Sequence, residues 1–356
     1  MKSIKDWLKL AVQGGASDIF VGAGRPVSFK LKGVITKQSE EPVSRETAEA
    51  LVRELFELAR RDAKRLEVGG DDDFPITIPG EARFRVSAYQ QRGSYAAVIR
   101  VVVFDLPNYK DLQIPEGAMS VANEKNGLVL VTGPTGSGKT TTLACIIDAI
   151  NNSRNAHIIT LEDPIEYLHR DRKCIISQRE ISTDTESYLV AIRACLRQAP
   201  DIILLGEMRD HETIKTAMTA AETGHLVIST LHTLGAANTI DRIIDVFPSG
   251  QQQQIRVQLS MILRSVITQQ LLPGINGGVV PAFEIMHVNG AIRNLIRESK
   301  VHQLDNAIQT SSGSGMIGMD AYILNLLQKG EIAKDTALAQ ASNPDQMAKA
   351  IERVKL

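Results

Sequence analysis

Residues 133–142 read GPTGSGKTTT and match the phosphate-binding loop pattern G-x-x-x-x-G-K-[ST]. In such a loop the glycines let the backbone approach a phosphate group, and successive N–H groups converge on it at the N-terminus of a helix. The Lys139 ammonium should reach the β- and γ-phosphates, and the Thr140 hydroxyl could bind Mg²⁺. We therefore expect a binding site for ATP with Mg²⁺. Its residues are Gly133, Pro134, Thr135, Gly136, Ser137, Gly138, Lys139, Thr140 and Thr141.

Acidic residues follow two further apolar runs, each at the point where a strand should end. The run in IITLEDPIEY leads into Glu162, Asp163 and Glu166, and the run in DIILLGEMRD leads into Glu207, with Asp210 nearby. Ligands bind at the carboxyl ends of parallel strands, so one of these carboxylates could hold Mg²⁺ and another could orient or deprotonate the attacking water. Any single acid could instead be a solvated loop residue, but two such clusters after a phosphate loop favour a functional role.

Two histidines, His225 and His232, stand at the ends of the apolar run in GHLVISTLHT. Side chains alternate between the faces of a strand, so a separation of seven residues puts them on opposite faces and does not suit a metal pair. An isolated histidine is more often structural, and the residues alone leave both roles open.

Two arginines, Arg85 and Arg100, fall in neighbouring predicted strands near the N-terminus. A planar guanidinium suits phosphate, and an arginine can stabilise the charge that develops during phosphoryl transfer. The alternative is that both are surface residues of a half-exposed sheet.

The first hundred residues predict a small α/β domain. A strand is expected in GRPVSFKLKGVI (24–35), and Ser44 could cap a helix whose apolar positions recur at helical spacing up to Ala59. Two more strands, ARFRVSAYQ (82–90) and SYAAVIRVVVF (94–104), should be joined by a turn near QRGS.

Helix and strand patterns alternate in the second part of the chain, which implies parallel βαβ units. Strands are expected at 127–133, 157–163, 201–207 and 225–233, and helices at 141–151, 185–198 and 211–224. A long helix is predicted over 251–271, ending before Pro273, and the chain from about 289 should be helical, interrupted by a flexible SSGSG at 311–315. We expect an N-terminal domain at 1–104, an interdomain linker at 105–117 and an ATPase domain at 118–356.

Composition narrows the class of protein. The chain has 356 residues, 40 Lys and Arg against 41 Asp and Glu, and a net charge of −1, which argues against a domain-wide nucleic-acid footprint. Cys145, Cys174 and Cys195 form no C-x-x-C pair, so a paired-cysteine zinc site is not expected. Neither a membrane-spanning run nor a signal-peptide pattern is present, so we expect a cytoplasmic location.

The motifs together resemble a known family. GPTGSGKTTT, ITLEDPIEY, LLGEMRD and GHLVISTLHT resemble the Walker A, aspartate-box, Walker B and histidine-box motifs of the type II/IV secretion ATPase superfamily, in the family's order. The opening GGASDIFVGAGRPVSFKLKGVI resembles the start of its N-terminal PAS-like domain, and AIRNLIRE (291–298) resembles the C-terminal signature of the type IV pilus retraction ATPases, the PilT family. From the residues alone, AIRNLIRE would be an amphipathic packing helix capped by Asn289.

The resemblance implies an α/β fold: a PAS-like N-terminal domain joined to a RecA-like P-loop ATPase domain that forms homohexameric rings. It implies that Glu162 activates water, that Glu207 replaces the usual Walker B aspartate and serves Mg²⁺, and that His232, together with His225, contacts the γ-phosphate region. Arg85 and Arg100 match the paired arginines that close on the nucleotide.

The resemblance also implies a motor that powers pilus retraction. It would act on an inner-membrane platform protein from the cytoplasmic face of the inner membrane, peripheral to the membrane through that partner and without nucleic acid. Whether Arg293 and Arg297 contact the platform stays open. The alternatives are an accessory retraction paralogue, an assembly or type II secretion ATPase (which usually carries an extra N-terminal domain and zinc cysteines), a nucleic-acid-translocating RecA-like motor, and a nucleotide-binding scaffold without turnover.

Overall fold

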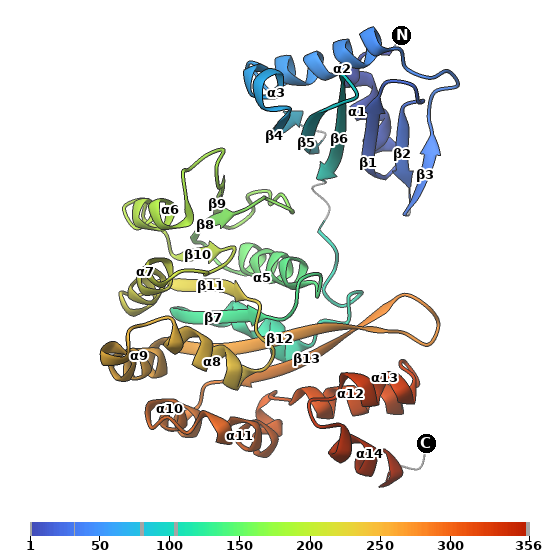
Figure 1. Cartoon of the computed structure of the whole chain (residues 1–356). Coiled ribbons are helices and arrows are strands. Elements are labelled where there is room, and N and C mark those ends of the chain that lie inside the picture. The colour runs from blue at the N-terminus through green and yellow to red at the C-terminus, as the bar shows by residue number, and fades with distance from the viewer. Residues whose placement is uncertain (1, 32, 79–81, 103–105, 354–356) are drawn as a thin grey trace. The chain divides into compact units, whose positions relative to one another are not determined.

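The computed structural model describes residues 2–31, 33–78, 82–102 and 106–353. The chain divides into two compact units, one of Met1–Leu106 with Glu166–Leu168 and one of Pro107–Ile165 with His169–Leu356. Figure 1 labels most of the helices and strands of both units. The boundary predicted between 104 and 105 falls on residues 103–105, which lie outside the described part of the chain.

The first unit is built on an antiparallel sheet with the strand order β3-β2-β1-β6-β5-β4. Its strands are β1 (Ala16–Gly22), β2 (Ser28–Leu31), β3 (Val34–Lys37), β4 (Asp71–Ile78), β5 (Ala82–Gln91) and β6 (Ser94–Val102). Its helices, α1 (Ile4–Gln13), α2 (Arg45–Leu58) and α3 (Lys64–Gly69), share one hydrophobic cluster with alternate residues of the sheet. The single strand predicted over 24–35 is a hairpin of β2 and β3, and Gly33 supplies the left-handed backbone (φ 84°) of its turn.

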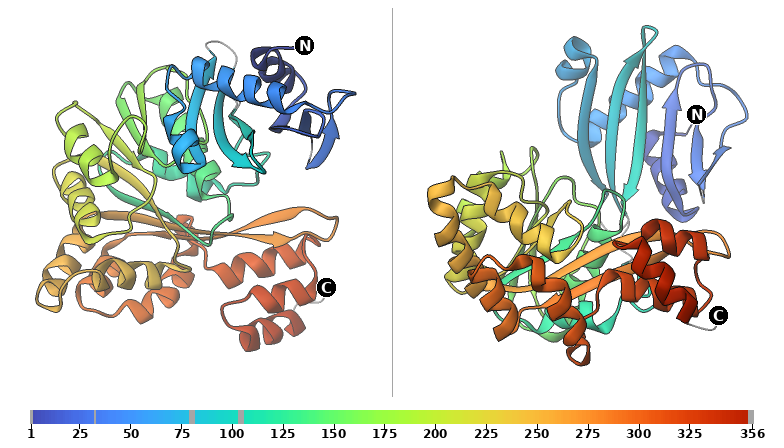
Figure 2. Two further views of the ribbon diagram at one scale, coloured as in Figure 1. Left: turned by 45° about the horizontal axis from the view of Figure 1, so that its top comes forward. Right: turned by 60° about the horizontal axis from the view of Figure 1, so that its bottom comes forward.

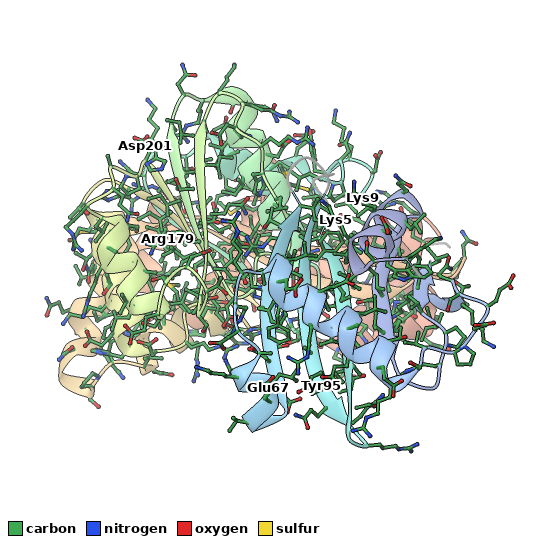
Figure 3. The ribbon with its side chains drawn as sticks, turned by 90° about the horizontal axis from the view of Figure 1, so that it is seen from above. Lys5, Lys9, Glu67, Tyr95, Arg179 and Asp201 are labelled. Atoms are coloured by element: carbon green, nitrogen blue, oxygen red, sulfur yellow. The ribbon has the colours of Figure 1, made fainter. Side chains whose placement is uncertain are left out.

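Arg53 of α2 contacts both helix α3 and strand β6. Its guanidinium lies 3.0 Å from Glu49, 3.2 Å from Glu67 on α3 and 5.6 Å from the centre of the Tyr95 ring on β6. Figure 3 labels Glu67 and Tyr95. The ion pairs are half-exposed, so each contributes at most about 1 kcal/mol, and the buried cluster is the main source of stability.

The second unit holds a seven-stranded sheet with the order β13-β12-β7-β11-β10-β8-β9, parallel except for β13. Its strands are β7 (Gly127–Thr132), β8 (His157–Glu162), β9 (Ile175–Glu180), β10 (Ile202–Leu205), β11 (Leu226–Leu231), β12 (Leu263–Pro273) and β13 (Val279–His287). Its helices are α4 (Glu116–Met119), α5 (Lys139–Ser153), α6 (Tyr188–Cys195), α7 (His211–Glu222), α8 (Ala236–Asp245), α9 (Ser249–Ile262), α10 (Gly290–Arg297), α11 (Leu304–Thr310), α12 (Met319–Gln328), α13 (Lys334–Gln340) and α14 (Pro344–Arg353).

Helices cover both faces of this sheet. On β7, Val129 and Val131 share a hydrophobic cluster with α5, whereas Leu128 and Leu130 share one with α6 to α9. Because successive side chains of a strand alternate, α5 lies on one face and α6 to α9 lie on the other. The β12–β13 hairpin, with α12 to α14 beside it, is visible in Figures 1 and 2 in orange and red.

The prediction of one long helix over 251–271 is wrong for the second half of that range. Helix α9 ends at Ile262, and the chain continues as strand β12 between β7 and β13. Residues 265–269 of β12 are all buried, because both faces of this strand are covered. The strand therefore shows no alternation of apolar and polar residues. The spacing of residues in a short buried run of this kind does not distinguish a strand from a helix. The prediction of helices from about 289 onward is confirmed by α10 to α14.

The described part of the predicted interdomain linker, residues 106–117, packs in part against the second unit. Ile114 is buried, and Tyr109 and Leu112 pack against the cluster that also holds α5. Those residues therefore belong to the core of the second unit. In the described part of the chain, no helix combines the length and the apolar character that crossing a membrane requires.

Candidate nucleotide-binding and catalytic site

The carboxyl ends of four parallel strands bring most of the predicted site together. Strands β7, β11, β10 and β8 are neighbours in register, with Thr132 beside Leu231 and Leu205 beside Leu161. The phosphate loop, His232, Glu207 and Glu162 all lie at or just beyond these ends. The shared edge follows from parallel pairing, as the βαβ pattern predicted.

The loop between β7 and α5 depends on its glycines. Gly133, Gly136 and Gly138 have φ values of 141°, 79° and 87°, which disfavour any residue with a side chain. A Cβ on Gly133 would lie 2.1 Å from the backbone oxygen of Gln269, whereas one on Gly136 would meet no atom within 4 Å. Gly133 is therefore required both by the backbone angle and by the close approach of β12.

Two polar groups inside the loop are suited to a phosphate. The Lys139 ammonium donates hydrogen bonds of 2.8 Å to the backbone oxygens of Gly133 and Pro134, and burial lowers the pKa of Lys139. The Ser137 hydroxyl is buried and has no hydrogen-bond partner among the described residues. An unsatisfied buried hydroxyl is costly, and a phosphate oxygen would satisfy it. The loop therefore fits a nucleotide phosphate.

Gln269 on β12 packs against the phosphate loop and is a residue of the site that the sequence motifs do not include. Its Oε1 accepts a hydrogen bond of 2.6 Å from the Thr142 hydroxyl on α5, and a Cβ on Gly138 would lie 2.8 Å from its Nε2. Both Gln269 and Thr142 are buried. The sequence signal for Gln269 is a polar residue inside the apolar run VITQQLL, but the helix predicted over 251–271 does not bring this run beside the phosphate loop.

Glu162 is a buried carboxylate at the end of β8. Its Oε1 accepts hydrogen bonds of 2.6 Å from the Thr160 hydroxyl and 3.2 Å from the Gln178 side-chain amide on β9. In turn, the Gln178 Oε1 accepts a hydrogen bond of 2.8 Å from the backbone N–H of His169. These contacts fix the orientation of the Glu162 side chain.

Glu207 lies two residues beyond β10 and meets two basic side chains. Its Oε1 is 2.7 Å from Arg209 Nε, and its Oε2 is 3.4 Å from His232 Nε2. The pKa of Tyr188 is raised by burial and by the negative charges of three carboxylates, among them Glu207 and Glu162. The structure thus brings Glu162, Glu207 and His232 to one edge.

His225 and Asp210 do not share this chemistry. His225 precedes β11 and lies at the opposite edge of the sheet, roughly 20 Å from His232 along the strand. Its Nδ1 is 2.9 Å from the backbone oxygen of Ala220 at the end of α7. Asp210 caps α7 by accepting a hydrogen bond of 2.9 Å from the Thr213 N–H. Both residues have structural contacts that account for them.

The candidate metal ligands are oxygen donors. Thr140 lies in the first turn of α5, and Glu207 lies beyond β10, which suits Mg²⁺, a cation that is commonly held by a few protein oxygens together with phosphate oxygens and water. Among the described residues no group of three His, Cys, Asp or Glu side chains could hold a metal ion by itself.

Arg85 and Arg100 belong to the first unit. They are directly opposite each other on β5 and β6, and Arg85 is exposed, in alternation with the buried Phe84 and Val86. The Arg100 Nε lies 3.1 Å from Oδ1 of Asp18 on β1, and the Arg100 side chain is 67% exposed. The two side chains thus leave the sheet from neighbouring strands on the face that does not pack on the helices. Their role toward a nucleotide stays a prediction.

Comparison with known proteins yields consistent matches. Residues 1–314 match the model of the family described as type II/IV secretion system protein (T2SSE). The chain is 44% identical over 342 residues to the type IV pilus retractation ATPase PilT of Pseudomonas aeruginosa, covering 96% of this chain and 99% of that protein. It is 48% identical over 277 residues to a twitching motility protein of Neisseria gonorrhoeae, covering 78% of this chain and 74% of the relative.

A solved structure, that of the pilus retraction motor PilT with bound ADP, is similar to this chain with a TM-score of 0.90 and 42% sequence identity, covering 98% of this chain and 100% of the other. The expected fold class, an α/β protein with a PAS-like N-terminal domain and a RecA-like P-loop ATPase domain, is confirmed by these matches.

Proposed function

We propose that this chain, which belongs to the type II/IV secretion system protein family, is an ATP-hydrolysing motor that powers the retraction of type IV pili. The observation that carries this function is the 44% identity to a pilus retraction ATPase over almost the whole of both chains. The phosphate loop and the carboxylates at the sheet edge supply the parts that hydrolysis requires.

The loop residues bind the phosphates in this proposal. The backbone N–H groups at the start of α5 and the Ser137 hydroxyl donate to phosphate oxygens, because the helix N-terminus favours an anion. The Lys139 ammonium leaves the carbonyls of Gly133 and Pro134 for the β- and γ-phosphates. Its buried position strengthens that interaction, since the local dielectric constant is lower than in water.

Glu162 is the proposed base. Water attacks the γ-phosphorus, the bond from phosphorus to the bridging oxygen breaks, ADP leaves, and the proton of the water passes to the Glu162 carboxylate. The hydrogen bonds from Thr160 and Gln178 hold this carboxylate in one orientation, as a general base requires.

Thr140 and Glu207 are the proposed ligands of Mg²⁺, which neutralises charge on the β- and γ-phosphates when it is bound. His232, 3.4 Å from Glu207, is proposed to contact the γ-phosphate region. His225 is left out of the proposal because it lies at the other edge of the sheet. Arg85 and Arg100 are proposed to stabilise the charge on the transferred phosphoryl group.

The motor is proposed to be a homohexamer that acts on an inner-membrane platform protein at the pilus base, from the cytoplasmic face. Support comes from the relatives named for pilus retraction and twitching motility. Within AIRNLIRE, the Arg293 guanidinium donates a hydrogen bond of 3.1 Å to the backbone oxygen of Ser260 on α9, whereas the guanidinium of the exposed Arg297 donates one of 2.6 Å to Asn294 of its own helix. Arg297 is therefore the better candidate for a partner contact.

A deletion strain tests the proposal. We expect loss of the gene to leave long surface pili and to abolish twitching motility, and we expect wild type to restore motility. Lys139→Ala should not restore it, whereas Lys215→Ala, a change at an exposed lysine of α7, should. Loss of pili in the deletion strain would instead indicate an assembly ATPase, and unchanged motility would contradict a retraction function.

A further inference from the structure

Glu207, the carboxylate proposed to bind Mg²⁺, is paired with an arginine that the proposed hydrolysis does not use. The Nε of Arg209 lies 2.7 Å from Glu207 Oε1, so the two side chains form an ion pair at contact distance. The other oxygen of the carboxylate, Oε2, is 3.4 Å from His232 Nε2. Both oxygens of Glu207 therefore already face a basic side chain.

The two members of this ion pair differ in their exposure to solvent. The Glu207 side chain is 15% exposed, whereas the Arg209 side chain is 76% exposed. The carboxylate is thus largely buried, and the guanidinium approaches it from the solvent side. Separation of the pair should move Arg209 rather than Glu207, because a guanidinium at the surface is readily hydrated and a buried carboxylate is not.

The main chain around Arg209 is anchored on both sides. Arg209 lies in the short segment that joins β10 to α7 (Figure 1). The residue before it, Met208, is buried in the hydrophobic cluster that also contains residues of β10 and α7. The residue after it, Asp210, caps α7. The Arg209 side chain can therefore turn away from Glu207 without a rearrangement of the main chain.

A metal ion at Glu207 would compete with this ion pair. A carboxylate oxygen binds Mg²⁺ at about 2.0–2.1 Å, and a guanidinium on the same oxygen would bring a second positive charge within a few ångströms of the metal. Because like charges at that separation repel each other, Arg209 and the metal are alternative partners of Oε1. The ion pair neutralises the carboxylate without a metal, and the need to separate it opposes metal binding.

We propose that Arg209 is a positioning residue that competes with Mg²⁺ for Glu207. It holds the carboxylate between rounds of hydrolysis, and it leaves Oε1 when nucleotide binds with Mg²⁺. The site therefore binds the metal less tightly than its oxygen ligands alone would, which favours the release of ADP with its Mg²⁺ after hydrolysis. The inference rests on the proposed function in that it takes Glu207 to be a ligand of Mg²⁺.

Titration of the full-length protein and ADP with Mn²⁺ tests the competition. Mn²⁺ takes the same oxygen ligands as Mg²⁺, and its free concentration can be read from its electron paramagnetic resonance signal. Protein is kept in excess over ADP, so that all of the nucleotide is bound. We expect Arg209→Gln to bind Mn²⁺ about two- to fivefold more tightly than wild type does, which is the gain that loss of an exposed ion pair allows. Because Arg209 is exposed, this change should leave the fold intact.

Arg172→Gln is the matched control. Arg172 is also an exposed arginine, and it lies 3.9 Å from Asp148 of α5, which is not a proposed metal ligand. The substitution removes the same charge from the protein as Arg209→Gln does. We expect this variant to bind Mn²⁺ as wild type does, which would exclude the change in net charge as the cause of the tighter binding.

A second pair of variants assigns the effect to Glu207. Glu207→Gln lacks the charge for which Arg209 and the metal compete, so it should bind Mn²⁺ more weakly than wild type does. The addition of Arg209→Gln to this variant should change its Mn²⁺ affinity no further, because Arg209 acts through Glu207.

Three results would overturn the competition. They are unchanged or weaker Mn²⁺ binding by Arg209→Gln, an equal gain in affinity in Arg172→Gln, and a gain that persists when Glu207 is already glutamine. Failure of wild type to bind ADP, or normal Mn²⁺ binding by Glu207→Gln, would instead overturn the proposed nucleotide and metal site on which the competition rests.

Discussion

Removal of the Gln269 amide should weaken nucleotide binding, although Gln269 lies outside the sequence motifs of the site. Gln269→Met keeps the length of the side chain but leaves the buried Thr142 hydroxyl without its acceptor at 2.6 Å. An unsatisfied buried hydroxyl costs about 1–3 kcal/mol. A bond from that hydroxyl to the carbonyl of Gly138, the residue that precedes α5, would place the cost near the lower end of this range.

The cost should appear in ADP affinity, because the hydrogen bond holds the first turns of α5 against β12 while the loop is formed. A loss of 1–3 kcal/mol corresponds to about a 5- to 150-fold weaker Kd. Thr142→Val removes the other partner and should weaken binding to a similar extent. The double variant should bind ADP no more weakly than the worse single variant, since the interaction can be lost only once.

Titration calorimetry with ADP measures all three variants. Gln270→Met is the control, because Gln270 is the next residue of β12 and faces the other side of the sheet. It should bind ADP as wild type does. Two results would contradict this prediction: losses in ADP-binding free energy that simply add in the double variant, or normal ADP binding by Gln269→Met. Either result would mean that the Gln269–Thr142 hydrogen bond does not maintain the shape of the phosphate loop.

Three further results are expected. Gly133→Ala should abolish ADP binding, because its Cβ would lie 2.1 Å from a backbone oxygen. The Cβ of Gly136→Ala has room, so this variant should cost only about 1–2 kcal/mol of backbone strain. Equal losses of ADP affinity in the two variants would contradict this prediction. Arg85→Ala should lower kcat at least about a thousandfold with ADP affinity kept, and Arg85→Lys should not restore it; normal turnover would remove Arg85 from catalysis. Burial lowers the pKa of His287 from its usual value of 6.5. As the pH falls, the unfolded chain therefore binds a proton at this histidine at a higher pH than the native protein does. The free energy of unfolding then decreases as the pH falls below about 6.5. The thermal midpoint of His287→Asn should therefore depend less on pH than that of wild type or of the exposed-site control His302→Asn, and identical pH profiles would exclude this cause.

The nucleotide edge was predictable because its signals are local. The phosphate loop is a contiguous motif with fixed spacing, and Glu162 and Glu207 each follow an apolar strand, so parallel pairing is enough to bring them together. Residue type alone does not distinguish His232 from His225. Their order along the chain does, because His232 follows β11 at the carboxyl end that meets the loop, whereas His225 precedes the strand.

Gln269 was not predictable for a different reason. It acquires its contact with Thr142 through β12, and because that strand is buried on both faces it shows no alternation that would tell it from a helix. Thr142 is 127 residues away in the chain, so no local pattern records the contact. Long-range pairing of buried strands was therefore the information that the sequence pattern lacked.

The most direct test of the account is ATP turnover by Glu162→Gln, with ADP affinity and pilus retraction measured for the same variant. The amide cannot accept the proton of the attacking water, so we predict that ADP binding is retained, that turnover falls by at least about a hundredfold and that retraction is lost. Glu186→Gln, at an exposed position, should behave as wild type. Turnover by Glu162→Gln at the wild-type rate would contradict the assignment of the base and, with it, the mechanism proposed for this motor.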